Sequence, residues 1–255
     1  MKRVAGAAAA VFALALGAGP VQADDARRSG ATFMSPSLQA MQRDDSANPA
    51  MLWVKDGEAL FSRPVGNGKS CASCHADGSL RGAAARYPLI DRSSGRLLNL
   101  AGRIAQCRTE RQQAAPLPSE SDEALGLAAY VALQSRGMPI APPAEDPKLR
   151  EWQARGQALY TQRMGQLNLS CAQCHDERAG LKLGGAPIPQ AHTTGYPTYR
   201  LEWQALGSLQ RRLRACVTGV RAQPFAADAD EWLALEAYLA RRAAGMAMDA
   251  PAVRP

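Results

Sequence analysis

The pentapeptides Cys71-Ala72-Ser73-Cys74-His75 and Cys171-Ala172-Gln173-Cys174-His175 decide how this chain folds. They lie 100 positions apart and contain four of the six cysteines. Two thiols at this spacing add across the vinyl groups of a porphyrin, and the adjacent histidine then ligates the iron. One such match is also compatible with zinc. Two matches at equivalent places predict two covalently bound haem c groups. The predicted attachment points are Cys71, Cys74, Cys171 and Cys174, and the proximal ligands are His75 and His175.

The first residues have the pattern of an export signal. Lys2 and Arg3 supply positive charge, residues 4–19 are mostly apolar, and Val21-Gln22-Ala23 is a small-residue cleavage site. The apolar run is too short, and too closely followed by acidic residues, for a membrane span. We therefore expect a signal peptide over residues 1–23, cleavage near Ala23 and a periplasmic protein.

The composition narrows the set of partners. The chain has 30 Lys and Arg against 23 Asp and Glu, which gives a formal net charge of +7. A basic, arginine-rich surface favours anionic ligands or acidic protein partners. Nucleic acid is not expected, because the chain has no recognised nucleic-acid-binding motif. No later segment has the roughly 18 uninterrupted apolar residues that a spanning helix needs, so no membrane span is expected.

Internal similarity predicts a duplicated chain. Gly57-Glu58-Ala59-Leu60-Phe61 precedes the first haem motif, and Gly156-Gln157-Ala158-Leu159-Tyr160 precedes the second. Downstream, Leu127-Ala128-Ala129-Tyr130-Val131 corresponds to Leu235-Glu236-Ala237-Tyr238-Leu239. Each copy has the order helix, haem motif, variable loop, second helix and closing helix. This order resembles the cytochrome c fold, in which the first and last helices pack beside the haem.

We predict an all-α fold of two tandem cytochrome c-like domains, each enclosing one haem. Prolines concentrated after residue 138 mark a linker between the copies. The predicted organisation is an N-terminal surface segment over 24–50, domain 1 over 51–139, the linker over 140–148 and domain 2 over 149–255.

The second axial ligands are not methionines in their usual place. Between the first haem motif and Gly137, the only strong iron ligand is Cys107. In the second copy the candidates are Lys182, His192 and Cys216. A thiolate donates strongly to ferric iron and lowers its reduction potential.

Cys107 and Cys216 follow matching arginine-bearing stretches. We therefore predict that Cys107 is the second axial ligand of the first haem iron and that Cys216 is the second axial ligand of the second. The alternatives are a disulfide between the two cysteines, which an oxidising compartment allows, and ligation by His192. The turn-rich surroundings of His192 favour a loop role or a contact with a haem propionate.

An arginine cluster surrounds Cys216 in the sequence; its members are Arg211, Arg212, Arg214 and Arg221. Arg212 lies four residues before Cys216 and shares its helical face. Nearby guanidinium groups favour thiolate over thiol and hold an incoming oxyanion by paired hydrogen bonds. Cys107 has Arg103 at the same offset, so arginine alone does not distinguish the two sites.

The stretch from Ser208-Leu209-Gln210-Arg211-Arg212 through Cys216 to Arg221-Ala222-Gln223-Pro224-Phe225 resembles a known active-site segment. It is similar to that of the A subunits of SoxAX cytochromes, the L-cysteine S-thiosulfotransferases of bacterial sulfur oxidation. The resemblance covers essentially the whole chain, including the export signal and the cysteine that follows each haem motif. Some members of that family lack the first haem. This chain keeps the first motif and Cys107, so it resembles the di-haem form.

The resemblance implies an enzyme that joins thiosulfate to a cysteine of the sulfur-carrier protein SoxYZ and passes two electrons to c-type haem. It implies that Cys216 is both the distal ligand of the second haem and the catalytic cysteine, carried as a persulfide or thiosulfonate. Arg212 is then expected to hold the anionic substrate. The implied partners are the mono-haem cytochrome SoxX, in a heterodimer, the carrier SoxYZ and an electron-accepting cytochrome c.

Two other functions are compatible with the residues. A di-haem electron-transfer cytochrome explains both haem motifs but gives no reason for two cysteines in place of methionine. A thiosulfate dehydrogenase, which couples two thiosulfates into tetrathionate, also uses His-Cys haem ligation. Tetrathionate formation without a carrier protein would favour the dehydrogenase.

Overall fold

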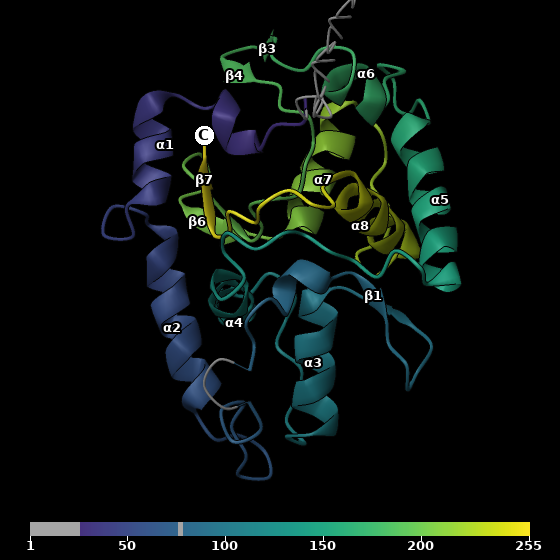
Figure 1. Ribbon diagram of the computed structural model, residues 1–255. Coiled ribbons are helices and arrows are strands. Elements are labelled where there is room, and N and C mark those ends of the chain that lie inside the picture. Colours follow the sequence, from purple (N-terminus) through teal and green to yellow (C-terminus); the bar gives the residue numbers. More distant parts are fainter. Residues whose placement is uncertain (1–25, 76–78) are drawn as a thin grey trace, which may run out of the picture.

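The computed structural model describes residues 26–75 and 79–255, so the predicted signal peptide lies outside the described residues. Most elements of the described chain are helices (Figure 1). They are η1 (Gly30–Phe33), α1 (Pro36–Arg43), α2 (Ala50–Ser62), η2 (Ala84–Arg86), α3 (Leu100–Glu110), α4 (Asp122–Leu133), α5 (Pro147–Thr161), α6 (Cys171–His175), α7 (Leu209–Gly219) and α8 (Asp230–Arg242). None of the described helices is long and apolar enough to cross a membrane.

The described chain also contains short strands, so the fold is mostly helical rather than all-α. The strands are β1 (Leu89–Ile90), β2 (Leu97–Leu98), β3 (Lys182–Leu183), β4 (Ala186–Pro187), β5 (Thr198–Arg200), β6 (Ala205–Gly207) and β7 (Ala252–Arg254). β1 pairs with β2 and β3 with β4, whereas β5 lies between β6 and β7. The loops that follow the haem motifs contain β-hairpins. The all-α prediction lacked these hairpins, because it was based on helical periodicity.

Side-chain caps set where the cysteine-bearing helices begin. Asn99 accepts a hydrogen bond from the Gly102 amide at the start of α3, and Ser208 accepts one from the Arg211 amide at the start of α7. Such caps satisfy backbone donors that the first turn leaves unpaired. Cys107 and Cys216 each lie eight residues after their cap, so both have the same position along their helices.

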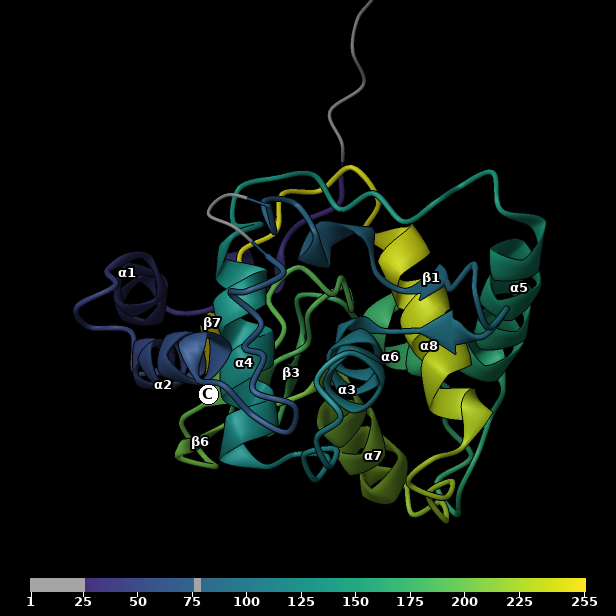
Figure 2. The same ribbon diagram turned by 90° about the horizontal axis from the view of Figure 1, so that it is seen from below.

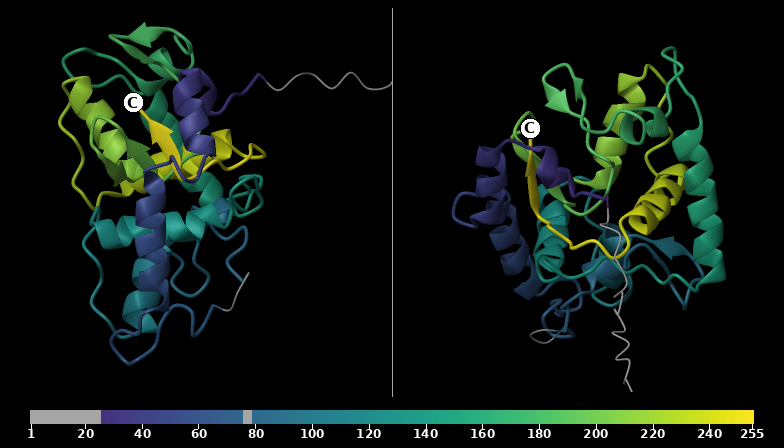
Figure 3. Two further views of the ribbon diagram at one scale, coloured as in Figure 1. Left: turned by 90° about the vertical axis from the view of Figure 1, so that its left-hand side faces the viewer. Right: turned by 45° about the horizontal axis from the view of Figure 1, so that its top comes forward.

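Each half is held by a close crossing of two helices. α2 packs on α4, and α5 packs on α8. Glycines allow this approach, because an ideal Cβ on Gly57 would lie 2.0 Å from the Gly126 carbonyl oxygen. An ideal Cβ on Gly156 would lie 1.9 Å from the Ala234 carbonyl oxygen. α2, α3 and α4 occupy one end of the molecule, whereas α6, α7 and α8 occupy the other (Figures 1 and 3).

The two halves share an apolar contact, and the chain termini join the second half. Ala50 and Val54 of α2 cluster with Leu125 of α4 and with Leu206 of β6. α1 lies beside the C-terminal strand β7, so the segment before α2 crosses to the half that carries the second haem motif (Figures 1 and 2). The predicted surface segment is therefore a packed part of that half.

Substituting Gly156 with alanine is expected to destabilise the second half. The added methyl group meets backbone of α8, which cannot move without shifting the helix crossing. Overpacking of this kind costs about 1–3 kcal/mol, more than the roughly 1 kcal/mol that alanine gains in helix propensity. Thermal unfolding followed by circular dichroism measures the difference. Gly219→Ala in α7 is the matched control, because a Cβ there meets nothing within 4 Å; equal melting temperatures for the two variants would contradict the expectation.

A buried carboxyl group lies where α8 meets the first half. Glu236 is 8% exposed, and Asn99 Nδ2 donates to its Oε1 over 2.9 Å. Burial raises the pKa of Glu236 to about 7, although hydrogen bonds from Asn99 and Gln210 act in the opposite direction. The negative charge of nearby Glu120 adds to the increase in the pKa.

This raised pKa predicts how stability depends on pH. The folded state holds the Glu236 proton more tightly than the unfolded state, so its contribution is greatest below the ordinary pKa of 4.5 and is lost as pH rises through about 7. Glu236→Gln is expected to remove that loss. Its free energy of unfolding relative to wild type should increase between pH 5 and pH 8, by up to roughly 3 kcal/mol. Urea unfolding at both pH values tests this, with the exposed Glu58→Gln as control; parallel pH profiles for wild type and Glu236→Gln would refute it.

Candidate haem centres and anion site

The first haem motif opens onto a cavity that also contains Cys107. Cys71, Cys74 and His75 of the motif line this cavity together with Arg103 and Cys107 of α3. The His75 amide donates to the Cys71 carbonyl over 2.9 Å, so the pentapeptide forms one helical turn. Apolar residues complete the walls, among them Phe61, Leu100, Leu127 and Val131.

The second haem motif is the helix α6. Ser170 and Gln173 form a capping box that starts this helix. Cys171, Cys174 and His175 are therefore held three and four residues apart on one helical face. His175 lies in a second cavity together with Cys216 of α7.

The proximal histidine of the second motif is oriented by a backbone group. Its Nδ1 lies 2.7 Å from the Pro189 carbonyl oxygen, an acceptor, so Nδ1 carries the proton. Nε2 is left for a metal, and the carbonyl increases its basicity. His175 and Cys216 line the same cavity, and the imidazole lies close enough to the Cys216 thiol to lower its pKa.

The residues present fit haem c better than they fit zinc or a disulfide. Among the described residues, no three His, Cys, Asp or Glu side chains converge to hold a metal ion, as a structural zinc site requires. None of the six cysteines is joined to another in a disulfide, so the alternative of a Cys107–Cys216 disulfide is not present. The first cavity instead combines Cys71, Cys74, His75 and Cys107 with apolar walls. The second is lined by His175 and Cys216, and α6 carries Cys171 and Cys174 beside that histidine, so both halves hold the set that haem c needs.

The surroundings of the two distal cysteines differ. Burial acts to raise the pKa of Cys216, but the hydrogen bond from His175 and the charges of Arg212 and Arg200 outweigh it, so this pKa is lowered. Burial raises the pKa of Cys107 despite the charge of Arg103. The arginines in the sequence did not distinguish the two cysteines, whereas the pKa directions of the two thiols do.

Three arginines from three elements line the cavity that contains Cys216. Arg212 comes from α7, Arg200 from β5 and Arg254 from β7. Arg211 and Arg214 of the predicted arginine cluster instead lie over the rings of Trp203 and Trp232, with guanidinium carbons 4.2 Å and 5.8 Å from the ring centroids. Only Arg212 of that cluster therefore reaches this cavity.

The two remaining ligand candidates of the second half are also placed. His192 lines the same cavity as Cys216, whereas Lys182 belongs to the exposed strand β3. His192 is part of the cavity wall, and its loop role or contact with a haem propionate stays a prediction.

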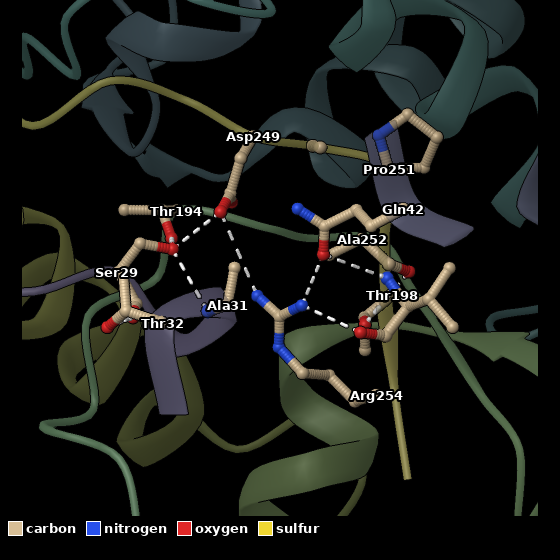
Figure 4. A network of polar contacts seen from close by, with 12 residues as sticks. Ser29, Ala31, Thr32, Gln42, Thr194, Thr198, Asp249, Pro251, Ala252 and Arg254 are labelled. Atoms are coloured by element: carbon tan, nitrogen blue, oxygen red, sulfur yellow. Dashed lines mark hydrogen bonds and ion pairs between the residues drawn. The ribbon is translucent and has the colours of Figure 1, made fainter. Parts of the chain in front are cut away.

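Arg254 reaches the cavity through a network that joins both ends of the described chain (Figure 4). Its guanidinium group donates to Gln42 of α1 and lies 3.9 Å from Asp249. Ser29 donates to Asp249 over 2.5 Å and lies 3.1 Å from the hydroxyl of Thr194. No motif in the sequence indicates this network, because its residues lie far apart along the chain.

Two cavities in which the histidine of a Cys-x-x-Cys-His motif meets a further cysteine define a c-type cytochrome. Comparison with known proteins narrows the class. The family model "SoxA/TsdA, cytochrome c domain" matches residues 56–140 and again residues 155–248. The chain belongs to the SoxA family.

The curated relatives and solved structures agree with this assignment. The L-cysteine S-thiosulfotransferase subunit SoxA of Pseudaminobacter salicylatoxidans is 36% identical over 89% of this chain and 80% of its own length. The SoxA subunit of Paracoccus pantotrophus is 36% identical over 89% of this chain and 78% of its own length. The crystal structure of SoxXA from P. pantotrophus superposes with a TM-score of 0.86 at 35% identity, covering 90% of this chain and 87% of that one. These matches confirm the resemblance seen in the sequence.

Proposed function

We propose that this chain is the catalytic subunit of an L-cysteine S-thiosulfotransferase. Its relatives carry that name, and its second cavity places an arginine-flanked cysteine opposite the histidine of a haem motif. The pairing of Cys216 with His175 and Arg212 is the observation that carries the proposal. An electron-transfer cytochrome needs no such cysteine and no such arginine.

In the proposed reaction, thiosulfate and a thiol of the carrier protein SoxYZ form a new sulfur–sulfur bond. The thiol loses its proton and two electrons are released, so the product is a cysteine S-thiosulfonate. Haem iron, when bound, accepts one electron at a time, so two centres or two successive steps are needed. The electrons then leave to an electron-accepting cytochrome c.

Cys216 divides the reaction into two transfers. Its thiolate first bonds to the outer sulfur of thiosulfate, and this oxidation releases the two electrons. The carrier thiolate then attacks that sulfur, and Cys216 leaves as a thiolate ready for another cycle. Arg212 holds the sulfonate end by charge-assisted hydrogen bonds and keeps the outer sulfur near Cys216.

The proposal includes two haems in two duplicated domains. The residues that would hold them are Cys71, Cys74, His75 and Cys107 in the first, and Cys171, Cys174, His175 and Cys216 in the second. The double match of the family model and the repeated helix crossing support domains over 51–139 and 149–255, joined by the linker 140–148. The packing of α1 on β7 favours counting residues 24–50 with the second domain.

The proposal also assigns partners and location. The solved relative is a SoxXA structure, which supports a heterodimer with a SoxX cytochrome. The export pattern over residues 1–23 supports a periplasmic protein.

A reconstituted assay tests the function. The purified holoprotein with its SoxX partner is mixed with thiosulfate, SoxYZ and oxidised cytochrome c. We expect cytochrome c reduction that depends on SoxYZ, together with a thiosulfonate on the carrier cysteine detected by mass spectrometry. Tetrathionate formation in the absence of SoxYZ would instead identify a thiosulfate dehydrogenase, and no oxidation with either would leave an electron-transfer cytochrome.

Sulfur carried on Cys216 is expected in the protein as isolated. Alkylation without reductant followed by trypsin releases Cys216 in the peptide Ala215–Arg221 and Cys107 in the peptide Ile104–Arg108. Mass spectrometry should find an additional sulfur atom on the first peptide and none on the second. Equal modification of both peptides, or of neither, would contradict a specific carrier role for Cys216.

A further inference from the structure

The two cysteine helices are preceded by stretches that correspond residue by residue. Tyr87-Pro88-Leu89-Ile90-Asp91 matches Tyr196-Pro197-Thr198-Tyr199-Arg200, and the offset of 109 positions continues without a gap to Cys107 and Cys216. The hairpins have the same register, since Leu89 pairs with Leu98 as Thr198 pairs with Gly207. Each residue around the first distal cysteine therefore has a definite counterpart around the second.

In the first half, the arginine one turn before the cysteine is neutralised. Arg103 NH2 lies 2.6 Å from Asp91 Oδ1, and the Asp91 side chain is only 6% exposed. Ser93 and Ser94 donate to Asp91 Oδ2 over 2.6 Å and 2.7 Å. This carboxylate is therefore fixed in place, and its charge cancels that of Arg103 beside the first cavity.

In the second half, an arginine replaces that carboxylate. The counterpart of Asp91 is Arg200, and the counterpart of Arg103 is Arg212. Both line the cavity with Cys216, and among the described residues no ion pair neutralises Arg212. Arg200 is paired with Glu202, a carboxylate whose side chain is 52% exposed. The same backbone frame thus surrounds the first cysteine with balanced charge and the second with excess positive charge.

We propose that Arg200 is a substrate-binding residue that determines which of the two sites accepts the anion. Arg200 and Arg212 together hold the sulfonate oxygens of thiosulfate, and Asp91 denies the first site the same ligand. This inference rests on the proposed function. Two guanidinium groups of like charge disfavour each other in a partly buried cavity, and a bound dianion relieves that repulsion. Arginine suits the task because its planar fork matches the geometry of an oxyanion.

The test gives the second site the charge pattern of the first by replacing Arg200 with aspartate. In Arg200→Asp, the new carboxylate occupies the place from which Asp91 pairs with Arg103, so it should pair with Arg212. Calorimetric titration of thiosulfate into the oxidised holo-heterodimer, without carrier protein, measures the effect. We expect the dissociation constant to rise about tenfold or more, because a charge-assisted contact is lost and an anion is added. Arg200→Lys should lie between wild type and Arg200→Asp.

Arg214→Asp is the matched control. It makes the same change of charge on α7, but Arg214 is exposed and does not line the cavity, so thiosulfate affinity should stay near that of wild type. Steady-state rates should show the Arg200→Asp effect mainly in KM for thiosulfate. Absorbance spectra should show that both haems are retained.

Two results would overturn the inference. One is an unchanged dissociation constant in Arg200→Asp. The other is a raised dissociation constant accompanied by loss of the second haem or a shift of its reduction potential, which would assign Arg200 to a haem propionate. If thiosulfate affinity depends on Arg200 but the wild-type protein transfers nothing to SoxYZ, the proposed function is wrong and this inference still holds. If the wild-type protein binds no thiosulfate, both the proposed function and the role of Arg200 are wrong.

Discussion

A Cys216→Ala variant is expected to lose carrier-dependent thiosulfate oxidation by roughly a thousandfold or more while keeping both haems attached. Among the described residues that line the second cavity, Cys216 has the only thiol, and this thiol lies close to His175. Without it, thiosulfate and the carrier thiol have no covalent route through the site. The attachment thiols Cys171 and Cys174 are untouched, so haem content measured as the pyridine haemochrome should equal that of wild type.

Cys107→Ala is the built-in control for this variant. Cys107 occupies the equivalent helical position, and its cavity carries the Arg103–Asp91 pair in place of excess positive charge. We expect an altered spectrum for the first haem and retention of most activity. Retained carrier-dependent activity in Cys216→Ala, or equal losses in the two variants, would contradict the proposed mechanism.

The sequence predicted those parts of the site whose residues lie within a few positions of one another on one helix. A helical turn brings together Cys171, Cys174 and His175, and the same geometry aligns Arg212 with Cys216. These relations hold within a few residues, so they can be read before any tertiary structure is known. The crossing glycines Gly57 and Gly156 were also visible as a repeat, although their role in close packing was not.

The parts that the sequence analysis missed depend on tertiary contacts. The hairpin strands are two or three residues long, too short for an alternating pattern to identify them. Arg254 reaches the second cavity because β7 pairs with β5, a contact between residues 54 positions apart, such as Arg200 and Arg254. Arg200 was detectable in principle, because the gap-free correspondence of Tyr87-Pro88 with Tyr196-Pro197 extends to Asp91 and Arg200.

Asp91 in the first half and its counterpart Arg200 in the second carry opposite charges, which indicates how one copy of a duplicated cytochrome can acquire a reaction. Both halves keep the ligands, caps and helix crossing that stabilise a haem-binding domain. One difference between them lies at a hairpin position, where Asp91 in the first copy corresponds to Arg200 in the second, and Arg254 adds another guanidinium group to the second cavity. Reversing a charge beside a cysteine shifts the electrostatic potential of a small cavity towards attracting anions.

Arg212→Gln is expected to lower kcat/KM for thiosulfate about a hundredfold. Charge-assisted hydrogen bonds contribute roughly 1.5–3 kcal/mol, and each 1.36 kcal/mol corresponds to a tenfold change in rate. Glutamine keeps much of the aliphatic stem that packs in α7 but removes the charge, so folding should be preserved. Most of the loss should be in KM, because Arg212 holds the sulfonate end in the ground state and in the transition state alike. Arg212→Lys should recover part of the loss, since it restores the charge without the planar fork.

Arg214→Gln on the same helix separates a local contact from a general effect of surface charge. Arg214 lies over the ring of Trp232 and not on the cavity wall, so its loss should change KM for thiosulfate less than twofold, on the order of what a distant exposed charge contributes. The measurement is the thiosulfate dependence of cytochrome c reduction at two ionic strengths. Only the Arg212 variant should then lose affinity at both, because a contact inside the cavity is screened less than a surface charge. Equal effects of the two substitutions would mean that net charge, and not the position of Arg212 beside Cys216, attracts the anion.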